Sequence, residues 1–330
     1  MKCPLPLLSL IIILLTSSCS FNHMAVSSSS DLLYVISNEA EAGSNYEIFR
    51  IGTPANLQLL EGLLSESPQN KDLLLALTKG YGGYAFAVNE TEMLNEEWSG
   101  ANDYKSEFAR NQALLNYSRS LEFGIRYLHI EKIEFKKLLT QTNDLQAVTL
   151  LFNKYLSADK KNLELLLFTA QALVALINLQ KDNISLVAQL PLAKTMFDWV
   201  CAKNPNINFG NCAILQGALE ASRPKMLGGN PLKGKEIFLL GIENNPHNWL
   251  IRSMYMQYYL IPQNDKEGFD FQIKYLKEKQ QEFNSYHIYS ADIKNDDKNK
   301  NELGESHLRF YQSLGLKRTE MMNKYYKQFF

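Results

Sequence analysis

The residues with the clearest chemical potential lie in the stretch MLGGNPLKGKEIF, Met226 to Phe238. From Gly229 it reads G-N-P-L-K-G-K, which matches the phosphate-binding pattern G-x-x-x-x-G-K-[ST] in all but its last residue. In that pattern backbone N–H groups hold the phosphate oxygens and the Lys reaches the terminal phosphates. The stretch therefore raises the question of nucleotide binding.

Three features of the same region argue against a nucleotide. The position that needs Ser or Thr for magnesium is Glu236, whose charge would oppose a phosphate. The preceding stretch NCAILQGALEAS has the pattern of a helix and not of the buried strand that a phosphate loop follows. Asn and Pro in sequence suit the N-cap and the first turn of a helix. The sequence thus predicts a structural turn made by Gly228, Gly229, Asn230 and Pro231.

No other pattern points to bond chemistry. The sequence has no G-x-S-x-G, no H-E-x-x-H and no paired C-x-x-C, and its five histidines are scattered. Glu96 and Glu97 are adjacent carboxylates, but their polar surroundings favour a solvated loop over an acid–base pair. We predict that the protein is not an enzyme and that it uses no metal and no cofactor.

Binding is the stronger functional expectation. The stretch KGYGGYAFAV places three glycines among Tyr81, Tyr84 and Phe86 in one helical segment. Each Gly weakens a helix interior by about 0.8–1 kcal/mol, so a compensating role is expected. Two roles fit: close packing of helices with the aromatics in the core, or a surface where a ligand or partner approaches the backbone.

Two further groups are candidates for ligand or partner binding. Arg119 and Arg126 lie seven residues apart, hence on one face of a helix, where they could hold an anion or a partner's carboxylate; a solvated face explains them as well. The stretch SMYMQYYL carries Tyr255, Tyr258 and Tyr259 beside soft Met side chains. That composition suits an adaptable interface and also a core between repeats.

The elements that would position these residues are helices. Apolar residues recur at three- and four-residue spacing from about residue 32 onward, with short Gly, Pro, Asn and Asp clusters between the segments. We predict an all-α fold. The aromatic C-terminal helix is expected to cap it.

A repeat refines this prediction. One series of a small residue, an aromatic, a small residue and Pro recurs with the same spacing, in Ala193, Phe197, Val200 and Pro205 and again in Gly234, Phe238, Gly241 and Pro246. This order is typical of the second helix of a tetratricopeptide repeat (TPR), and the interval exceeds the usual length of about 34 residues. We therefore expect TPR-like helical hairpins, an α-solenoid with long turns between helices.

The first residues predict export. An apolar run from Pro4 to Leu15 follows one Lys and has the length of a signal-peptide core. Ser17 and Ser18 before Cys19 resemble a bacterial lipobox, with Thr16 where Leu is usual; a plain secretory signal is the alternative. We predict a signal peptide at 1–18, a lipidated Ser-rich tether at 19–31, and a single TPR-like helical domain at 32–330. Lipidation at Cys19 would anchor the chain to the membrane. Ser rather than Asp after Cys19 favours the outer membrane.

Charge and cysteine content bound the remaining possibilities. A formal net charge of -1 at pH 7 argues against a nucleic-acid partner. Within the predicted body, Cys201 and Cys212 flank the turn at Pro205. They could face each other across a helix hairpin as a disulfide, and two buried free thiols fit the same positions.

At this point the sequence resembles a specific family, the TatT lipoproteins, the T components of tripartite ATP-independent periplasmic (TRAP) transporters. The resemblance rests on the lipoprotein-like start and on the stretches GYGGYAFA, ARNQALLNYSRSLEFGIRYL and RPKMLGGNPLKGKEIFLLGIENNP, and it covers about residues 57–277. Asn230 stands where family members often have Asp. The resemblance implies a helical repeat body that faces the periplasm, forms a homotrimer, docks the transporter's periplasmic solute-binding protein and binds a small apolar ligand.

The first functional hypothesis is accordingly a membrane-anchored periplasmic lipoprotein of a TRAP-type uptake system. The alternative is a TPR lipoprotein that serves as a scaffold in outer-envelope assembly or secretion. Genes for a solute-binding protein and a permease beside this one would favour the first hypothesis, and copurification with outer-membrane assembly factors the second.

Overall fold

A computed structural model describes residues 34–35, 38–100, 103–141, 144–223, 228–287 and 303–330. In these ranges the chain is helical, with no strand, so the all-α prediction is confirmed there. Elements η2 and η4 are π-helices, and η1 and η5 are 3₁₀-helices. In chain order the elements are η1 Ala40–Ala42, α3 Tyr46–Glu66, α4 Lys71–Tyr84, η2 Ala85–Asn89, α5 Glu90–Ser99, α6 Asp103–Ile130, α7 Phe135–Thr140, α8 Leu145–Tyr155, α9 Lys160–Leu179, α10 Ile184–Val187, α11 Leu190–Lys203, α12 Ile207–Ser222, α13 Pro231–Asn244, α14 Trp249–Tyr255, η4 Met256–Leu260, α15 Lys266–His287, η5 Ser306–Leu308, α17 Arg309–Lys324 and α18 Tyr326–Phe329.

Side-chain caps fix where many of these helices begin. Asn45, Asn70 and Asp159 each stand one residue before a helix, and their side-chain oxygens accept hydrogen bonds from backbone N–H groups of the first turn of α3, α4 and α9. The same role falls to Asn248 before α14. An N-cap of this kind contributes about 1 kcal/mol, so short polar residues between apolar segments set the helix boundaries.

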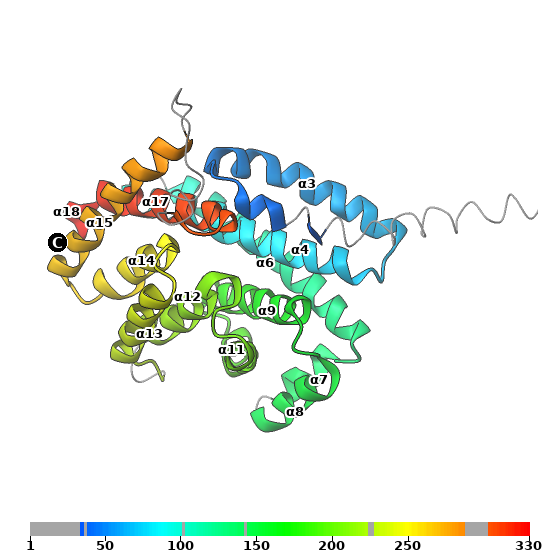
Figure 1. The fold of residues 1–330 in the computed structure, drawn as a ribbon. Helices are drawn as coiled ribbons and strands as arrows, with labels where there is room; N and C mark the ends of the chain where they lie inside the picture. The colour runs from blue at the N-terminus through cyan, green and yellow to red at the C-terminus, as the bar shows by residue number, and fades with distance from the viewer. Residues whose placement is uncertain (1–33, 36–37, 101–102, 142–143, 224–227, 288–302) are drawn as a thin grey trace, which may run out of the picture.

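Helices α9 and α12 run through the middle of the molecule, with α3, α4 and α6 on one side and α11 and α13 on the other (Figure 1). Most of α9 is buried. Among the described helices it is the one whose length and apolar composition would suffice to cross a membrane, and 89% of its apolar stretch is buried inside the protein. That burial identifies α9 as the central core helix of the fold.

Helices α12 and α13 approach each other closely because glycines replace side chains at their contact. A Cβ atom on Gly234 would lie 2.8 Å from Ala221, and one on Gly241 would lie 2.4 Å from Ala213 Cβ. The ring of Phe238 is fully buried beside Gly217, whose added Cβ would lie 3.0 Å from it. The two small residues and the aromatic of the predicted repeat therefore lie at this contact. The assignment of the helices to TPR-like repeats stays a prediction.

The Gly-Gly turn that leads into α13 is the structural turn expected from the sequence. Gly228 has a φ of 76°, a conformation that L side chains rarely adopt. A Cβ atom on Gly229 would lie 2.0 Å from the carbonyl oxygen of Arg223. Asn230 is the N-cap of α13, accepting a hydrogen bond from the N–H of Lys233, and Pro231 opens the helix. Since α12 precedes this turn, the strand that a phosphate loop requires is not there.

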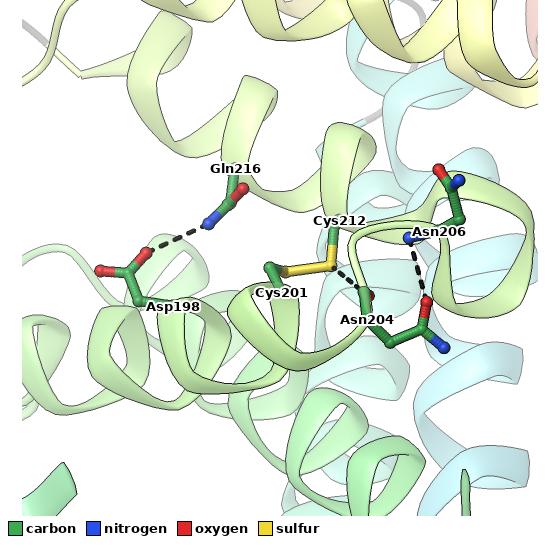
Figure 2. Close-up of a disulfide and its surroundings, with 6 residues drawn as sticks. All are labelled: Asp198, Cys201, Asn204, Asn206, Cys212 and Gln216. Carbon is green, nitrogen blue, oxygen red and sulfur yellow. Dashed lines mark hydrogen bonds between the residues drawn. A yellow bond between two sulfur atoms is a disulfide. The ribbon is translucent and has the colours of Figure 1, made fainter. Parts of the chain in front are cut away.

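A disulfide joins the end of α11 to the beginning of α12 (Figure 2). The Cα atoms of Cys201 and Cys212 lie 5.8 Å apart, in the usual range for such a bond. The amide of Gln216 donates a hydrogen bond of 3.1 Å to Asp198, which adds a second link between the two helices. A cross-link over a short loop contributes about 3 kcal/mol in the chain-entropy description. It holds the start of α12 in place.

The first turn of α12 is not an ordinary helical turn. Asn208, Phe209 and Gly210 have φ angles of 47°, 57° and 91°, so three consecutive residues are left-handed. Positive φ is strained for residues with a side chain, by about 1–3 kcal/mol each. The amide of Asn248 supports the segment by donating a hydrogen bond of 2.8 Å to the carbonyl oxygen of Phe209. The regular part of α12 therefore begins at Asn211, directly before the disulfide.

Arg318 of α17 links the two π-helices by hydrogen bonds. This side chain is fully buried, and it donates hydrogen bonds to the carbonyl oxygen of Phe86 in η2 and to Gln257 Oε1 in η4. It also donates to Thr91 Oγ1 and lies 3.6 Å from the carboxylate of Glu90. A π-helix leaves backbone groups without their regular partners, so a buried guanidinium with several donors is well suited to this position.

Several predicted features lie outside the described residues. They are the signal peptide at 1–18, the lipidation site Cys19 and the tether at 19–31. For these segments the expectations above stay predictions.

Candidate functional site

The candidate site is an internal cavity of about 250 Å³ that lies between helices from both ends of the chain. Apolar side chains make up most of its wall. They come from α3 (Phe49, Leu57, Leu59 and Leu60), α4 (Ala76), η2 (Phe86), α9 (Phe168), α12 (Ile214 and Leu215), α14 (Leu250) and α17 (Phe310 and Leu314).

The cavity reaches the surface along α3. Leu59 and Asn56 belong to the lining and are both exposed, Leu59 to 62%. Thr53, one turn earlier, also belongs to the lining and is half-buried. These residues mark the mouth of the cavity. A small apolar molecule could enter there without passing the charged groups described below.

The three glycines of α4 have different surroundings: one lies at a close contact between helices, and two line the cavity. A Cβ atom on Gly82 would lie 2.9 Å from Ser120 Oγ of α6, so this glycine allows close packing of two helices. Gly80 and Gly83 line the cavity. At Gly83 an added Cβ would meet nothing within 4 Å, so the missing side chain leaves open space in the cavity.

A group of charges borders the cavity, and two of its members, Lys79 and Glu41, belong to the lining. Lys79 Nζ lies 2.5 Å from the carboxylate of Glu41 and 3.5 Å from that of Glu164, and it donates a hydrogen bond of 2.8 Å to Asn38. Glu164 is fully buried and accepts a hydrogen bond of 2.7 Å from the hydroxyl of Tyr34. We call these five residues the Lys79 cluster.

The electrostatics of the Lys79 cluster follow from its burial and its excess of carboxylates. Burial acts to lower the pKa of Lys79, but the charges of Glu41 and Glu164 outweigh it and the pKa is raised. Burial raises the pKa of Tyr34, and the charge and hydrogen bond of Glu164 add to this. Burial, followed by the charges of Glu41 and Glu164, also raises the pKa of Tyr311 in the cavity wall. Lys79 therefore stays charged and both tyrosines stay protonated at neutral pH.

The predicted binding residues separate into four places, of which the tyrosines of α14 and η4 are described last. Phe86 lies in the cavity wall. Tyr81, Arg119 and Arg126 gather outside it, around the ring of Phe123, with the two guanidinium groups 4.6 and 5.6 Å from the ring centroid. Tyr84 lies between α3 and α4, where its hydroxyl donates to the carbonyl oxygen of Arg50.

Arg119 and Tyr81 are already bound to carboxylates of the chain itself. Arg119 pairs with Glu61 at 2.8 Å and with Glu122 at 2.6 Å, and the hydroxyl of Tyr81 donates to Glu61 at 2.6 Å. Burial and the charge of Glu61 raise the pKa of Tyr81 to about 12. Arg126 donates to the carbonyl oxygen of Pro68. The role of these residues toward an anion or a partner stays a proposal.

The tyrosines of α14 and η4 lie in an apolar cluster that also contains Phe238, Trp249 and Met254. The rings of Tyr255 and Tyr259 stack with centroids 5.5 Å apart, and Phe238 packs against Tyr255. Burial raises the pKa of Tyr258, and the nearby charge of Glu90 adds to this. The cavity lining does not include these three tyrosines. Their packing fits the interpretation as a core between helices.

Sequence reasoning missed several wall residues. Helix α17 was expected to cap the fold, but its residues Phe310, Tyr311 and Leu314 line the cavity. Lys79 and Glu164 are far apart in the sequence and meet only in the fold. Glu164 carries a signal that could have been used, because it is a single carboxylate inside the apolar run LELLLF. Such a charge in a core helix requires a buried partner.

The described residues offer no cluster for a metal, since they include no group of three or more His, Cys, Asp or Glu side chains in position to hold an ion.

A comparison with protein families gives one finding that covers most of the chain. The family model described as the TRAP transporter T-component matches residues 44–285, which is more than half of the sequence. No curated protein matches the chain. The matched range includes helices α3 to α14 that form most of the cavity wall, and α17 lies beyond it. The resemblance noted from the sequence is thereby confirmed, and the chain belongs to the TRAP transporter T-component family.

Proposed function

We propose that this T-component docks the periplasmic solute-binding subunit of its TRAP system and takes up a small apolar ligand in the cavity. The family is one of transporter components of the bacterial envelope and not of enzymes. The observation that carries the proposal is the largely apolar cavity with its mouth on α3. A transporter component with such a cavity has a place for a ligand and a route by which a partner could deliver it.

The lining supports an apolar ligand. Four phenylalanines and a series of leucines provide surface that gains about 25 cal/mol for each Å² removed from water. Ligand pockets in proteins usually enclose about 300–1,000 Å³, so a cavity of about 250 Å³ suits a small molecule or one chain of a larger molecule. The glycine at position 83 keeps this space open.

The surface beside the mouth supports docking. Ile48 and Ile51 on α3 are 70% and 68% exposed, and they lie on the same helix as the exposed mouth residue Leu59. Their spacing of three and eight residues places them on one side of α3. We call these residues the α3 stripe. Apolar residues that gather on a surface in this way mark interaction sites, and a partner seated on the α3 stripe would lie over the mouth.

Replacement of Ile51 by Asp should weaken binding of the solute-binding subunit at least about tenfold, because loss of one central apolar contact costs about 2 kcal/mol or more. Biolayer interferometry with the solute-binding subunit of the same TRAP system measures the effect. Leu240→Asp is the matched control: Leu240 is 58% exposed on α13, away from α3, and its variant should bind like the wild type.

Two outcomes would change the proposal. Equal weakening in both variants, or none in either, would remove the α3 stripe as the docking surface. If light scattering instead shows that Ile51→Asp breaks an oligomer, the stripe belongs to contacts between copies of this chain. The trimer implied by the resemblance is then the species to expect in the wild type.

We further propose that the chain is anchored through a lipid on Cys19 and faces the periplasm from the outer membrane. The lipobox-like residues before Cys19 and the envelope location of the family support this. Cells that express the wild type should incorporate radiolabelled palmitate into the protein, and Cys19→Ser should abolish the label. Labelling that persists in the variant would refute the anchor.

A further inference from the structure

Two buried amide side chains in the cavity wall have no hydrogen-bond partner among the described residues. Gln171 on α9 and Asn211 at the beginning of α12 are 9% and 8% exposed, and both line the cavity. Each carries two N–H donors and one carbonyl acceptor. Neither side chain hydrogen-bonds to the described part of the chain, so these groups face the cavity.

Such groups are unfavourable in an apolar cavity unless they have a role. The polar atoms of Gln171 and Asn211 open onto the cavity and are not among the fully enclosed side-chain atoms that lack a partner. A ligand that covers them without forming hydrogen bonds in return would lose about 1–3 kcal/mol. Leu side chains at these positions would fit the apolar wall formed by Phe168, Ile214 and Leu215. Gln171 and Asn211 are thus buried polar groups of the described wall with capacity for a ligand, in contrast to Asn56, which is exposed at the mouth.

The local structure aims Asn211 at the cavity. It follows the three left-handed residues Asn208 to Gly210 and precedes the disulfide-bonded Cys212, so the direction in which α12 starts is fixed from both sides. The ring of Phe209 packs edge-on against Tyr311 of the cavity wall, with centroids 6.1 Å apart. Strained backbone of this kind is retained where the surrounding structure requires it, often at ligand sites.

The charged groups of the wall, by contrast, are already occupied. The three donors of Lys79 are matched by Asn38, Glu41 and Glu164, and Glu41 also interacts with the hydroxyl of Tyr311. Two carboxylates face one ammonium group, and even with the exposed Lys160 at 4.0 Å from Glu164 the cluster is at most neutral. Among the wall residues that the structure describes, a ligand carboxylate would therefore find no free cation, and it would meet nearby negative charge.

We propose that the cavity selects an apolar ligand with an uncharged head group, such as a primary amide or an alcohol, which Gln171 and Asn211 bind by hydrogen bonds. This inference rests on the proposed uptake of an apolar ligand and specifies its chemical class. An aliphatic carboxylate with the same chain is the ligand that the cavity rejects.

The test is a displacement series on the full-length protein. N-phenylnaphthylamine, an uncharged apolar fluorophore, serves as the reporter, and a fatty amide, alcohol and carboxylate of one chain length compete with it at neutral pH. The amide and the alcohol should displace the reporter at concentrations at least about tenfold lower than the carboxylate, the effect of one or two hydrogen bonds. Carboxylate binding as tight as that of the amide would overturn the inference.

Variants locate the selectivity. Gln171→Leu and Asn211→Leu should each bind the reporter but lose most of the preference for the amide. Gln272→Leu is the control, because Gln272 is a buried amide outside the cavity that accepts a hydrogen bond from Arg252. Preference retained in both cavity variants would also overturn the inference. A wild-type protein that binds no reporter would overturn the proposed uptake itself, whereas reporter binding without head-group preference would overturn only this inference.

Discussion

The Gly83→Leu variant is expected to lose binding of apolar ligands while it gains stability. The new side chain enters the open space at this position and occupies room for about four methylene groups of a ligand. Each buried methylene contributes about 0.8 kcal/mol, so the affinity for N-phenylnaphthylamine should fall about a hundredfold or more. At the same time, removal of a glycine from a helix raises the free energy of unfolding by about 0.5–1 kcal/mol.

The pairing of these two effects is what makes the test specific. Fluorescence titration measures the affinity, and urea unfolding followed by circular dichroism measures the stability. Gly62→Leu is the matched control, since Gly62 lies exposed on α3 and an added Cβ there also meets nothing within 4 Å. It should show the gain in stability with unchanged affinity. Unchanged affinity in Gly83→Leu would mean that the cavity does not bind the ligand.

Loss of the Arg318 side chain is expected to have the largest effect on stability. Arg318→Met keeps much of the apolar volume but leaves the carbonyl oxygen of Phe86 without its donor and Glu90 without its cation. Glu90 would keep the hydrogen bond of 2.6 Å from the hydroxyl of Tyr117. Removal of one partner from a buried ion pair costs about 3–5 kcal/mol, so the urea midpoint should fall strongly.

The neighbouring residue provides the control. Lys317 is half-buried and lies 3.7 Å from the exposed carboxylate of Glu47, and solvent-accessible pairs of this kind contribute about 0–1 kcal/mol. Lys317→Met should therefore unfold close to the wild-type midpoint. If the two variants shift the midpoint equally, Arg318 does not hold the two π-helices together. Helix α17 would then only cover the part of the fold that the family model matches.

Local features could be predicted from the sequence because they depend on a few neighbouring residues. The Asn-Pro start of α13 and the left-handed Gly228 follow from backbone preferences of single residues. Gly234, Phe238 and Gly241, which the repeat pattern marked in the sequence, lie at the close contact between α12 and α13. Each of these required no knowledge of where distant parts of the chain would lie.

The cavity could not be predicted in the same way, because its wall combines side chains that are far apart in the sequence. Phe86 and Gly83 were recognised as part of a binding candidate, but Gln171 and Phe310 had no local signal that linked them to it. The charge of Lys79 is meaningful only once its partners are brought to it by the fold. The helices could therefore be predicted from composition and periodicity, whereas the candidate site depends on long-range packing.

The most direct test of the central claim is a crystal structure of the protein grown with a bromine-labelled fatty alcohol, read from the anomalous signal of the bromine. If the cavity is the ligand site, one strong peak will lie inside the wall formed by Phe86, Leu215 and Leu314, and Gly83→Leu crystals treated in the same way will lack it. Bromine found only on the outer surface, or a cavity peak of equal strength in the variant, would contradict the account.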